Sequence, residues 1–259
     1  MLGENIGGLD QSREDRMGRV VTFAELPASN IAPGVSSAPI TSGETQEMAA
    51  ELIRIAPGER WTATAPRGSD CYLFMLKGAG TVSAAGRRHR LPPQAFAAVE
   101  EGVEITVEND GGAPASVIKV IAPPYPDGRT MPGFRDKIAV AERGNAPVID
   151  LPKEKKKRVY FVADAAVKSQ RGHAMIVVYG KETVTPLHHH PNAESMFVML
   201  EGALTFTVNG KQALLAPGQA AYFGCNDQHG LRVAEGAPGA SFLEFHIPAA
   251  FTTVYGPQS

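Results

Sequence analysis

Short segments in which apolar and polar residues alternate recur along the whole chain, and most are bounded by Gly, Pro or Asn. An alternation of period two places the apolar side chains on one face of a β-strand. The sequence predicts strands at 72–76, 80–84, 116–121, 175–179, 195–200, 204–208 and 242–247. Asn209-Gly210 predicts a two-residue hairpin turn, because both positions tolerate a positive φ. Short strands joined by tight turns predict an all-β protein of the double-sheet jelly-roll class.

The pattern repeats itself within the chain. Residues 199–205 (MLEGALT) match residues 75–81 (MLKGAGT) at an offset of 124 positions. The same offset places Gly210 on Gly86 and Pro217 on Pro93. A fixed internal period indicates duplicated structural units. The sequence therefore predicts two tandem β-barrels.

Composition shifts suggest the boundaries of these units. We predict an N-terminal arm at 1–40, a first barrel at 41–126, a linker at 127–158 and a second barrel at 159–259. An arm of this kind can add a strand to the neighbouring barrel or to a partner subunit, or remain loose. The basic run at 153–158 (KEKKKR) is interpreted as a solvated loop or as a guard on an edge strand, where lysines discourage pairing.

Composition also narrows the class of protein. The chain has 259 residues, a net charge of −2 and 43% hydrophobic residues, which favours a soluble globular protein that binds neither nucleic acid nor membranes. No apolar run is long enough to cross a bilayer, and residues 1–19 lack the apolar core of a signal peptide. The two cysteines lie in different halves, so a disulfide framework is not expected. We expect a cytoplasmic protein.

Histidines and one glutamate supply the candidate chemistry. In the stretch HHHPNAE, His188 and His190 lie on one face of a strand while His189 points away. Glu194 can return on the next strand, and His229 follows a Pro217-Gly218 turn. Three imidazole nitrogens and one carboxylate suit a divalent transition metal such as iron, manganese, nickel, copper or zinc.

This pattern resembles the cupin superfamily. The first cupin motif contains Gly, His-x-His, a gap of three or four residues, Glu and a closing Gly, and the second runs from Pro-Gly through a strand to His. Here His188, His190 and Glu194 match with a three-residue gap, but the closing Gly202 comes one residue late. The resemblance implies two double-stranded β-helix (jelly-roll) barrels, a metal bound by His188, His190, Glu194 and His229, and a homodimer.

The first half lacks this ligand set. The internal offset places Thr64, Pro66 and Ile105 where the second half has His188, His190 and His229. We therefore expect one metal ion per chain, with iron favoured. Packing and dimerisation are the favoured roles of the first barrel. The alternative is a small ligand bound near Trp61, Arg67, Asp70 and Tyr72.

The pocket around the metal is predicted by strand parity. Met196 and Val198 share the face of Glu194, and with Tyr222 and Arg232 they are the candidate substrate contacts. Glu244 and His246 share one face of the last long strand. If that face is the interior, they are the candidate catalytic acid and base beside the metal; if it is not, they lie on the surface.

Three functions remain open. The favoured one is a dioxygenase that binds an enolic or phenolic substrate and dioxygen on one metal, as some related cupins with three His and one Glu do. The second is a non-redox lyase, decarboxylase, isomerase or hydrolase in which the metal acts as a Lewis acid and Glu244 or His246 as the base. The third is a binding barrel without catalysis. An open metal site argues against the third, because structural sites tend to be closed.

Overall fold

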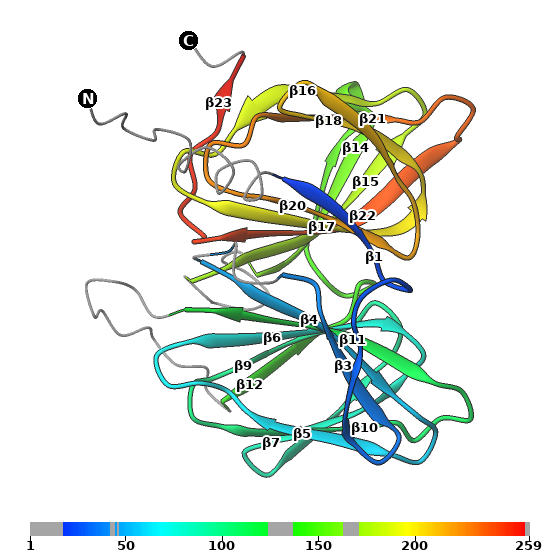
Figure 1. The fold of residues 1–259 in the computed structure, drawn as a ribbon, viewed down its shortest axis with the longest axis vertical. Coiled ribbons are helices and arrows are strands. Elements are labelled where there is room, and N and C mark those ends of the chain that lie inside the picture. Colours follow the sequence, from blue (N-terminus) through cyan, green and yellow to red (C-terminus); the bar gives the residue numbers. More distant parts are fainter. Residues whose placement is uncertain (1–17, 42–44, 46, 124–136, 163–170, 257–259) are drawn as a thin grey trace, which may run out of the picture.

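The computed structural model describes residues 18–41, 45, 47–123, 137–162 and 171–256. Their regular structure consists of 23 β-strands and one short 3₁₀ helix, so the predicted all-β fold is confirmed. The strands form four antiparallel sheets, two in each half of the molecule (Figure 1). Each half is a sandwich of two sheets. The predicted jelly-roll architecture is therefore confirmed, as two-sheet sandwiches whose sheets are not closed into a continuous barrel.

The N-terminal domain has a seven-stranded and a four-stranded sheet. In order, the larger contains β12 (Ile138–Ala141), β9 (Phe96–Val99), β6 (Asp70–Lys77), β11 (Ala115–Ala122), β4 (Ala49–Ile55), β3 (Val35–Pro39) and β2 (Ser29–Ala32). The smaller contains β5 (Arg60–Thr64), β10 (Glu104–Glu108), β7 (Gly80–Ala84) and β8 (Arg87–Leu91). An apolar core fills the space between the two sheets, with Trp61 and Ile105 among its buried members.

The C-terminal domain repeats this plan. In order, its seven-stranded sheet contains β1 (Arg19–Thr22), β20 (Gln219–Phe223), β17 (Glu194–Gly202), β22 (Gly239–Ile247), β15 (His173–Gly180), β14 (Lys156–Val162) and β13 (Val148–Leu151). The second sheet contains β19 (Lys211–Leu215), β18 (Leu204–Val208), β21 (His229–Val233), β16 (Val184–His189) and β23 (Val254–Tyr255), and the 3₁₀ helix η1 covers Pro152–Glu154. As predicted, Asn209-Gly210 closes the β18–β19 hairpin with positive φ at both residues (45° and 80°).

The two seven-stranded sheets pack against each other in the middle of the molecule, so the layers run four, seven, seven and five strands (Figure 1). One buried cluster contains side chains of both domains, including Phe74 and Phe96 from the first and Phe161 and Phe245 from the second. The rings of Phe96 and Phe161 stack at 5.3 Å across this interface. Each large sheet therefore buries one face inside its own sandwich and the other against the partner domain.

The structure places strands in the segments predicted as arm and linker. The described part of the N-terminal arm contains β1, which pairs with β20 of the C-terminal domain, and β2 and β3, which extend the N-terminal sheet. The predicted linker is structured where it is described, since 138–141 forms β12 of the first domain and 148–158 contains β13, η1 and the start of β14 of the second. Four of these strands, β1, β2, β12 and β13, lie at sheet edges, where a strand pairs on one side only and tolerates polar and basic residues. Residues 1–17 and 127–136 of these segments lie outside the described residues.

Among the described residues, no helix has the length and apolar character needed to span a bilayer.

Candidate metal centre and active site

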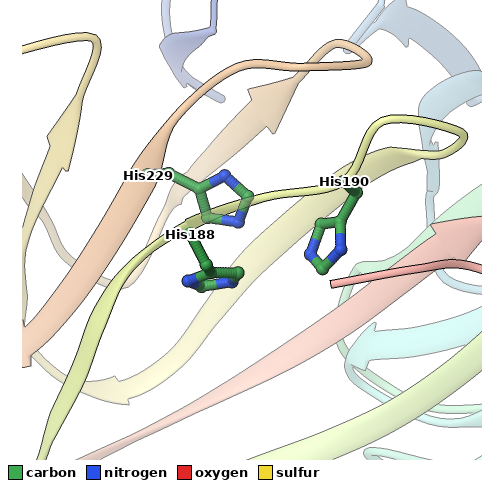
Figure 2. A group of neighbouring side chains, drawn as sticks. All are labelled: His188, His190 and His229. Atoms are coloured by element: carbon green, nitrogen blue, oxygen red, sulfur yellow. The ribbon is translucent and has the colours of Figure 1, made fainter. Parts of the chain in front are cut away.

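Three imidazoles converge inside the C-terminal sandwich (Figure 2). His188 lies near the end of β16, His190 follows that strand, and His229 opens β21 directly opposite His188. The ring centroids of His188 and His229 are 4.3 Å apart, and those of His190 and His229 are 5.3 Å apart. One nitrogen of each ring lies within 4.8 Å of the others. The predicted histidine part of the metal site is therefore assembled by the fold.

Backbone carbonyls fix the tautomer of all three rings. Nδ1 of His188, His190 and His229 lies 2.8, 3.0 and 2.8 Å from the carbonyl oxygens of Pro186, Thr252 and Asp227, respectively. Because a carbonyl only accepts, each Nδ1 carries the hydrogen and each Nε2 keeps its lone pair. Nε2 of His190 and of His229 is buried without a hydrogen-bond partner among the described residues. Such lone pairs suit metal coordination, with the carbonyls orienting the ligands.

Burial keeps these imidazoles neutral. It lowers the pKa of His229 to about 3 and that of His190 to about 4, and it also lowers the pKa of His188. A neutral imidazole is the form that binds a metal. The residues present therefore fit a divalent transition ion, with three nitrogen donors that are uncharged at neutral pH.

The structure does not bring Glu194, the predicted fourth ligand, to this cluster. Its Oε2 accepts hydrogen bonds from the backbone amides of Glu47 (2.9 Å) and Met48 (3.1 Å) of the N-terminal domain. Asp70, at the equivalent position of the first repeat, likewise faces the other domain, where Nη1 of Arg171 lies 3.3 Å from its Oδ1. Both carboxylates therefore link the two domains, on the opposite face of the sheet from the metal centre.

The late closing glycine is the signal that could have corrected this prediction. With a gap of four residues instead of three, Ser195 takes the place of the motif's glutamate and Gly202 has its usual spacing. In the structure, Ser195 has the interior orientation: its Oγ lies 2.7 Å from Nδ1 of His246. A one-residue change of register moves a strand side chain to the other face.

The four predicted substrate contacts lie away from the histidine cluster. Met196, Val198 and Tyr222 belong to the core between the domains, and Arg232 is exposed. None of these four predicted contacts lines the pocket beside the histidines. The neighbouring residues Phe197 and Leu231 line it instead.

Glu244 and His246 do face the interior. Nε2 of His246 lies 2.6 Å from Oε1 of Glu244, which completes a hydrogen-bonded chain from Ser195 through His246 to Glu244. The His246 ring lies 4.7 Å from the ring of His190 and stacks on Phe251 at 4.0 Å. Strand parity alone does not decide whether this pair faces the interior or the surface. The structure places it in the interior, beside the metal centre.

Glu244 is ionised in this environment. Burial by itself raises the pKa of its carboxyl, but the charge and hydrogen bond of His246, together with His173 and Arg158, outweigh burial and lower the pKa to about 2. A buried carboxylate with one hydrogen-bonded imidazole can accept a proton from a bound molecule.

The pocket that joins these groups has a volume of about 360 Å³. Its lining includes His188, His190, Glu244 and His246 at the metal centre and Lys156, Arg158, Tyr160 and Tyr179 along β14 and β15. The two cations were interpreted from sequence as a solvated or edge-guarding run. Residues 156 and 158 alternate along a strand, and every second residue of a strand shares a face. This spacing is the signal in the sequence that places both side chains on the pocket side.

Residues 175–245 match the Cupin domain family. The C-terminal domain is a cupin domain. The matched range begins in β15 and ends in β22. It contains His188, His190 and His229 as well as Glu244. No match to a curated protein sequence was found.

Solved structures of two-domain proteins share the fold of nearly the whole chain. It superposes on a glyoxylate-induced protein from Pseudomonas aeruginosa with a TM-score of 0.71 and 15% identity, covering 100% of this chain and 94% of that one. For oxalate decarboxylase from Lactobacillus farciminis the TM-score is 0.71, with 14% identity and coverage of 91% and 88%. For procruciferin, an 11S globulin from Brassica napus, it is 0.72, with 9% identity and coverage of 96% and 88%. At these identities the likeness concerns the fold alone.

Proposed function

We propose that this bicupin is a metal-dependent enzyme that performs non-redox acid–base chemistry on a small organic molecule. The observation that carries the proposal is the chain of hydrogen bonds from Ser195 through His246 to Glu244, in the same interior as the three-histidine centre. A buried carboxylate and imidazole are the usual instruments of proton transfer. A divalent ion held by His188, His190 and His229 would polarise an oxygen of the bound molecule.

Glu244 is the base in this scheme. When Nε2 of His246 carries its hydrogen, that N–H donates to Glu244 and keeps the carboxylate ionised. Nδ1 of His246 lies 2.7 Å from Oγ of Ser195, a hydroxyl that accepts from Nδ1–H when the ring is charged and donates to Nδ1 when the ring is neutral. A proton removed from the bound molecule is held by Glu244 and can return to another atom of the same molecule. Isomerases and eliminating lyases need such a transfer, whereas in a hydrolase the base takes the proton from water and in a decarboxylase the acid delivers one to the carbon that loses CO₂.

Two other functions were open from the sequence, and the site favours them less. A dioxygenase has no need of a carboxylate–imidazole–hydroxyl chain beside its metal. A binding protein without catalysis has no need of ionisable groups buried in one pocket. Oxalate decarboxylase, by its name a lyase, has the same fold.

A comparison of turnover with and without oxygen tests the proposal. A panel of small hydroxy, keto and dicarboxylic acids is incubated with the metal-loaded protein, aerobically and anaerobically, and products are identified by mass spectrometry. We expect anaerobic turnover. Glu244→Gln is expected to lower it by about 10²- to 10⁴-fold with unchanged metal content, because the carboxylate is a base and not a ligand.

The control is His89→Gln, on β8 of the N-terminal domain, which should leave turnover unchanged. Oxygen uptake that matches product formation, or a Glu244→Gln variant with full activity, would show that the acid–base proposal is wrong and return the dioxygenase to first place. Iron as the resident ion and a homodimer stay predictions, to be tested by elemental analysis and by the molecular mass in solution.

A further inference from the structure

One wall of the pocket is basic. Lys156, Arg158 and Tyr160 are alternate residues of β14, and all three line the pocket that contains the metal centre. Lys157 lies between them, faces outward with 56% of its side chain exposed, and pairs with Asp150 at 2.8 Å. The strand therefore divides its cations between an interior face and a solvent face.

The interior lysine is held inside the pocket. Only 9% of the Lys156 side chain is exposed, and its Nζ lies 5.2 Å from the centre of the Tyr179 ring and 3.4 Å from Oγ1 of Thr185. Its nearest carboxylate, Glu154, is 3.5 Å away and more than half exposed. A pair that reaches into solvent is screened, so it compensates the buried ammonium weakly.

Arg158 has unused hydrogen-bonding capacity. Its Nε is buried and has no hydrogen-bond partner among the described residues. Burial alone lowers the pKa of the guanidinium, but Tyr160 and the negative charge of Glu244 raise it, so the group is a fixed cation. A buried N–H donor without a partner is costly, and an anionic oxygen would satisfy it.

The charges of the pocket favour an anion. Among the described residues that line it, Lys156 and Arg158 are the fixed cations and Glu244 is the carboxylate. A divalent ion at the three neutral histidines adds to this positive excess.

Strand pairing places the basic wall two strands away from Glu244. Tyr160 pairs with Met175 and Met175 with Glu244, so Tyr160 and Glu244 lie on one row, two strands apart. Arg158 lies one row further along, opposite Val177. Neighbouring strands are about 4.8 Å apart, so the wall and Glu244 are on the order of 10 Å apart.

From this arrangement we propose that Lys156, Arg158 and Tyr160 form an anion subsite that selects substrates with a carboxylate or phosphate group at the end remote from Glu244. This inference deepens the proposed function and rests on it for the assignment of the pocket as a substrate site. Arg158 supplies a planar fork of donors that suits an oxyanion, and Lys156 supplies a point charge. The substrate would therefore have an anionic group at one end and the atom that gives up its proton to Glu244 at the other.

Binding of simple probes tests the subsite without knowledge of the substrate. Succinate, inorganic phosphate and the uncharged analogue succinamide are titrated calorimetrically into the purified protein with its resident metal, and again after chelation. We expect one of the anions to bind in both states, at least about tenfold more tightly than succinamide. The tighter of the two identifies the anionic group as carboxylate or phosphate.

Variants locate the binding. Arg158→Gln and Lys156→Met should each weaken it about tenfold or more, because each removes a charged donor. Lys157→Met, on the outer face of the same strand, should leave it within about twofold, because exposed charges contribute little. Arg158→Lys keeps the positive charge but lacks the planar fork of donors. Its thermal unfolding shows whether a loss of binding reflects a loss of the fold.

Three results would overturn the subsite: no anion binding in either state, equal binding of succinamide, or equal effects of Arg158→Gln and Lys157→Met. The subsite and the proposed function fail separately. If Arg158→Gln weakens anion binding while Glu244→Gln leaves turnover intact, the acid–base chemistry is wrong and the subsite stands. If Glu244→Gln abolishes turnover while Arg158→Gln leaves anion binding unchanged, the subsite is wrong and the acid–base chemistry stands.

Discussion

The two domains share one fold and differ in what they place inside it. In the C-terminal sandwich His188 pairs with His229 across β16 and β21. At the corresponding point of the N-terminal sandwich, Ala63 pairs with Ile105, and Ile105 is fully buried in the apolar core. The pairing that assembles a metal centre in one domain therefore assembles ordinary core packing in the other.

The acid–base residues show the same contrast. By strand pairing, the N-terminal counterparts are Lys119 for Glu244, Ile121 for His246 and Cys71 for Ser195. Lys119 is neutralised by Glu51 at 2.8 Å, and burial raises the pKa of Cys71 to about 12, which keeps the thiol protonated. Trp61 lies in the N-terminal core, while Tyr72 and Asp70 lie at the domain interface, which disfavours a ligand pocket at these residues. The two copies share the same fold. A few interior side chains determine which copy has the candidate metal centre and the acid–base residues.

The largest difference between the two domains should be in how substitutions affect the metal content. His188→Ala removes one of three ligands, and we expect metal content to fall from about one ion per chain to near zero. His89→Gln, on β8 of the N-terminal domain, should leave it unchanged. Elemental analysis of protein purified without a chelator or a His-tag makes the measurement. Two ions per chain in the wild type would contradict the single-site contrast.

The link between the domains should dominate stability. Arg171 and Asp70 form a buried ion pair, with 4% and 8% of their side chains exposed. Arg171→Met leaves the carboxylate buried without its cation, and we expect unfolding to become easier by about 3–5 kcal/mol. Arg88→Met breaks the exposed pair with Glu108 and should cost no more than about 1 kcal/mol. Denaturant titration compares them, and equal costs would argue against the interface as the stabilising contact.

Acid should weaken the metal-free protein through its C-terminal histidines. The pKa values of His190 and His229 are lowered to about 4 and about 3, whereas an unfolded histidine titrates near about 6.5. Between these values only the unfolded chain takes up protons, so the free energy of unfolding should fall as pH drops from about 6.5 to about 4. Above that window both states are neutral and the histidines contribute no slope. Denaturant titrations across the window should show a shallower dependence for His190→Gln; an unchanged slope would contradict the buried neutral imidazole.

Glu194→Gln should have the smallest effect. Gln keeps an acceptor oxygen for the amides of Glu47 and Met48 but loses the charge, so we expect a cost of about 1 kcal/mol and full metal content. Elemental analysis and denaturant titration on one preparation give both values. Loss of the metal in this variant would restore Glu194 as a ligand.

Much of the fold was readable from the sequence. The offset that matched 199–205 with 75–81 also relates β17 to β6 and β18 to β7, and the predicted Asn209-Gly210 turn closes its hairpin. Strands at edges were harder, because β12 and β13 need only one partner and have no two-sided apolar pattern. The three histidines of the centre were readable because His188 and His190 alternate on one face and His229 follows a marked turn.

The sequence by itself determined a duplicated all-β protein with three histidines that meet in its second half. Local alternation and turn residues act over a few positions, and such signals survive without knowledge of the rest of the molecule. Only the tertiary structure decided which face of β17 is the interior, and so that Glu194 links the domains while Ser195 joins His246 and Glu244. Both faces of that strand are buried, one in its own sandwich and one against the other domain, so alternation of apolar and polar residues could not distinguish them.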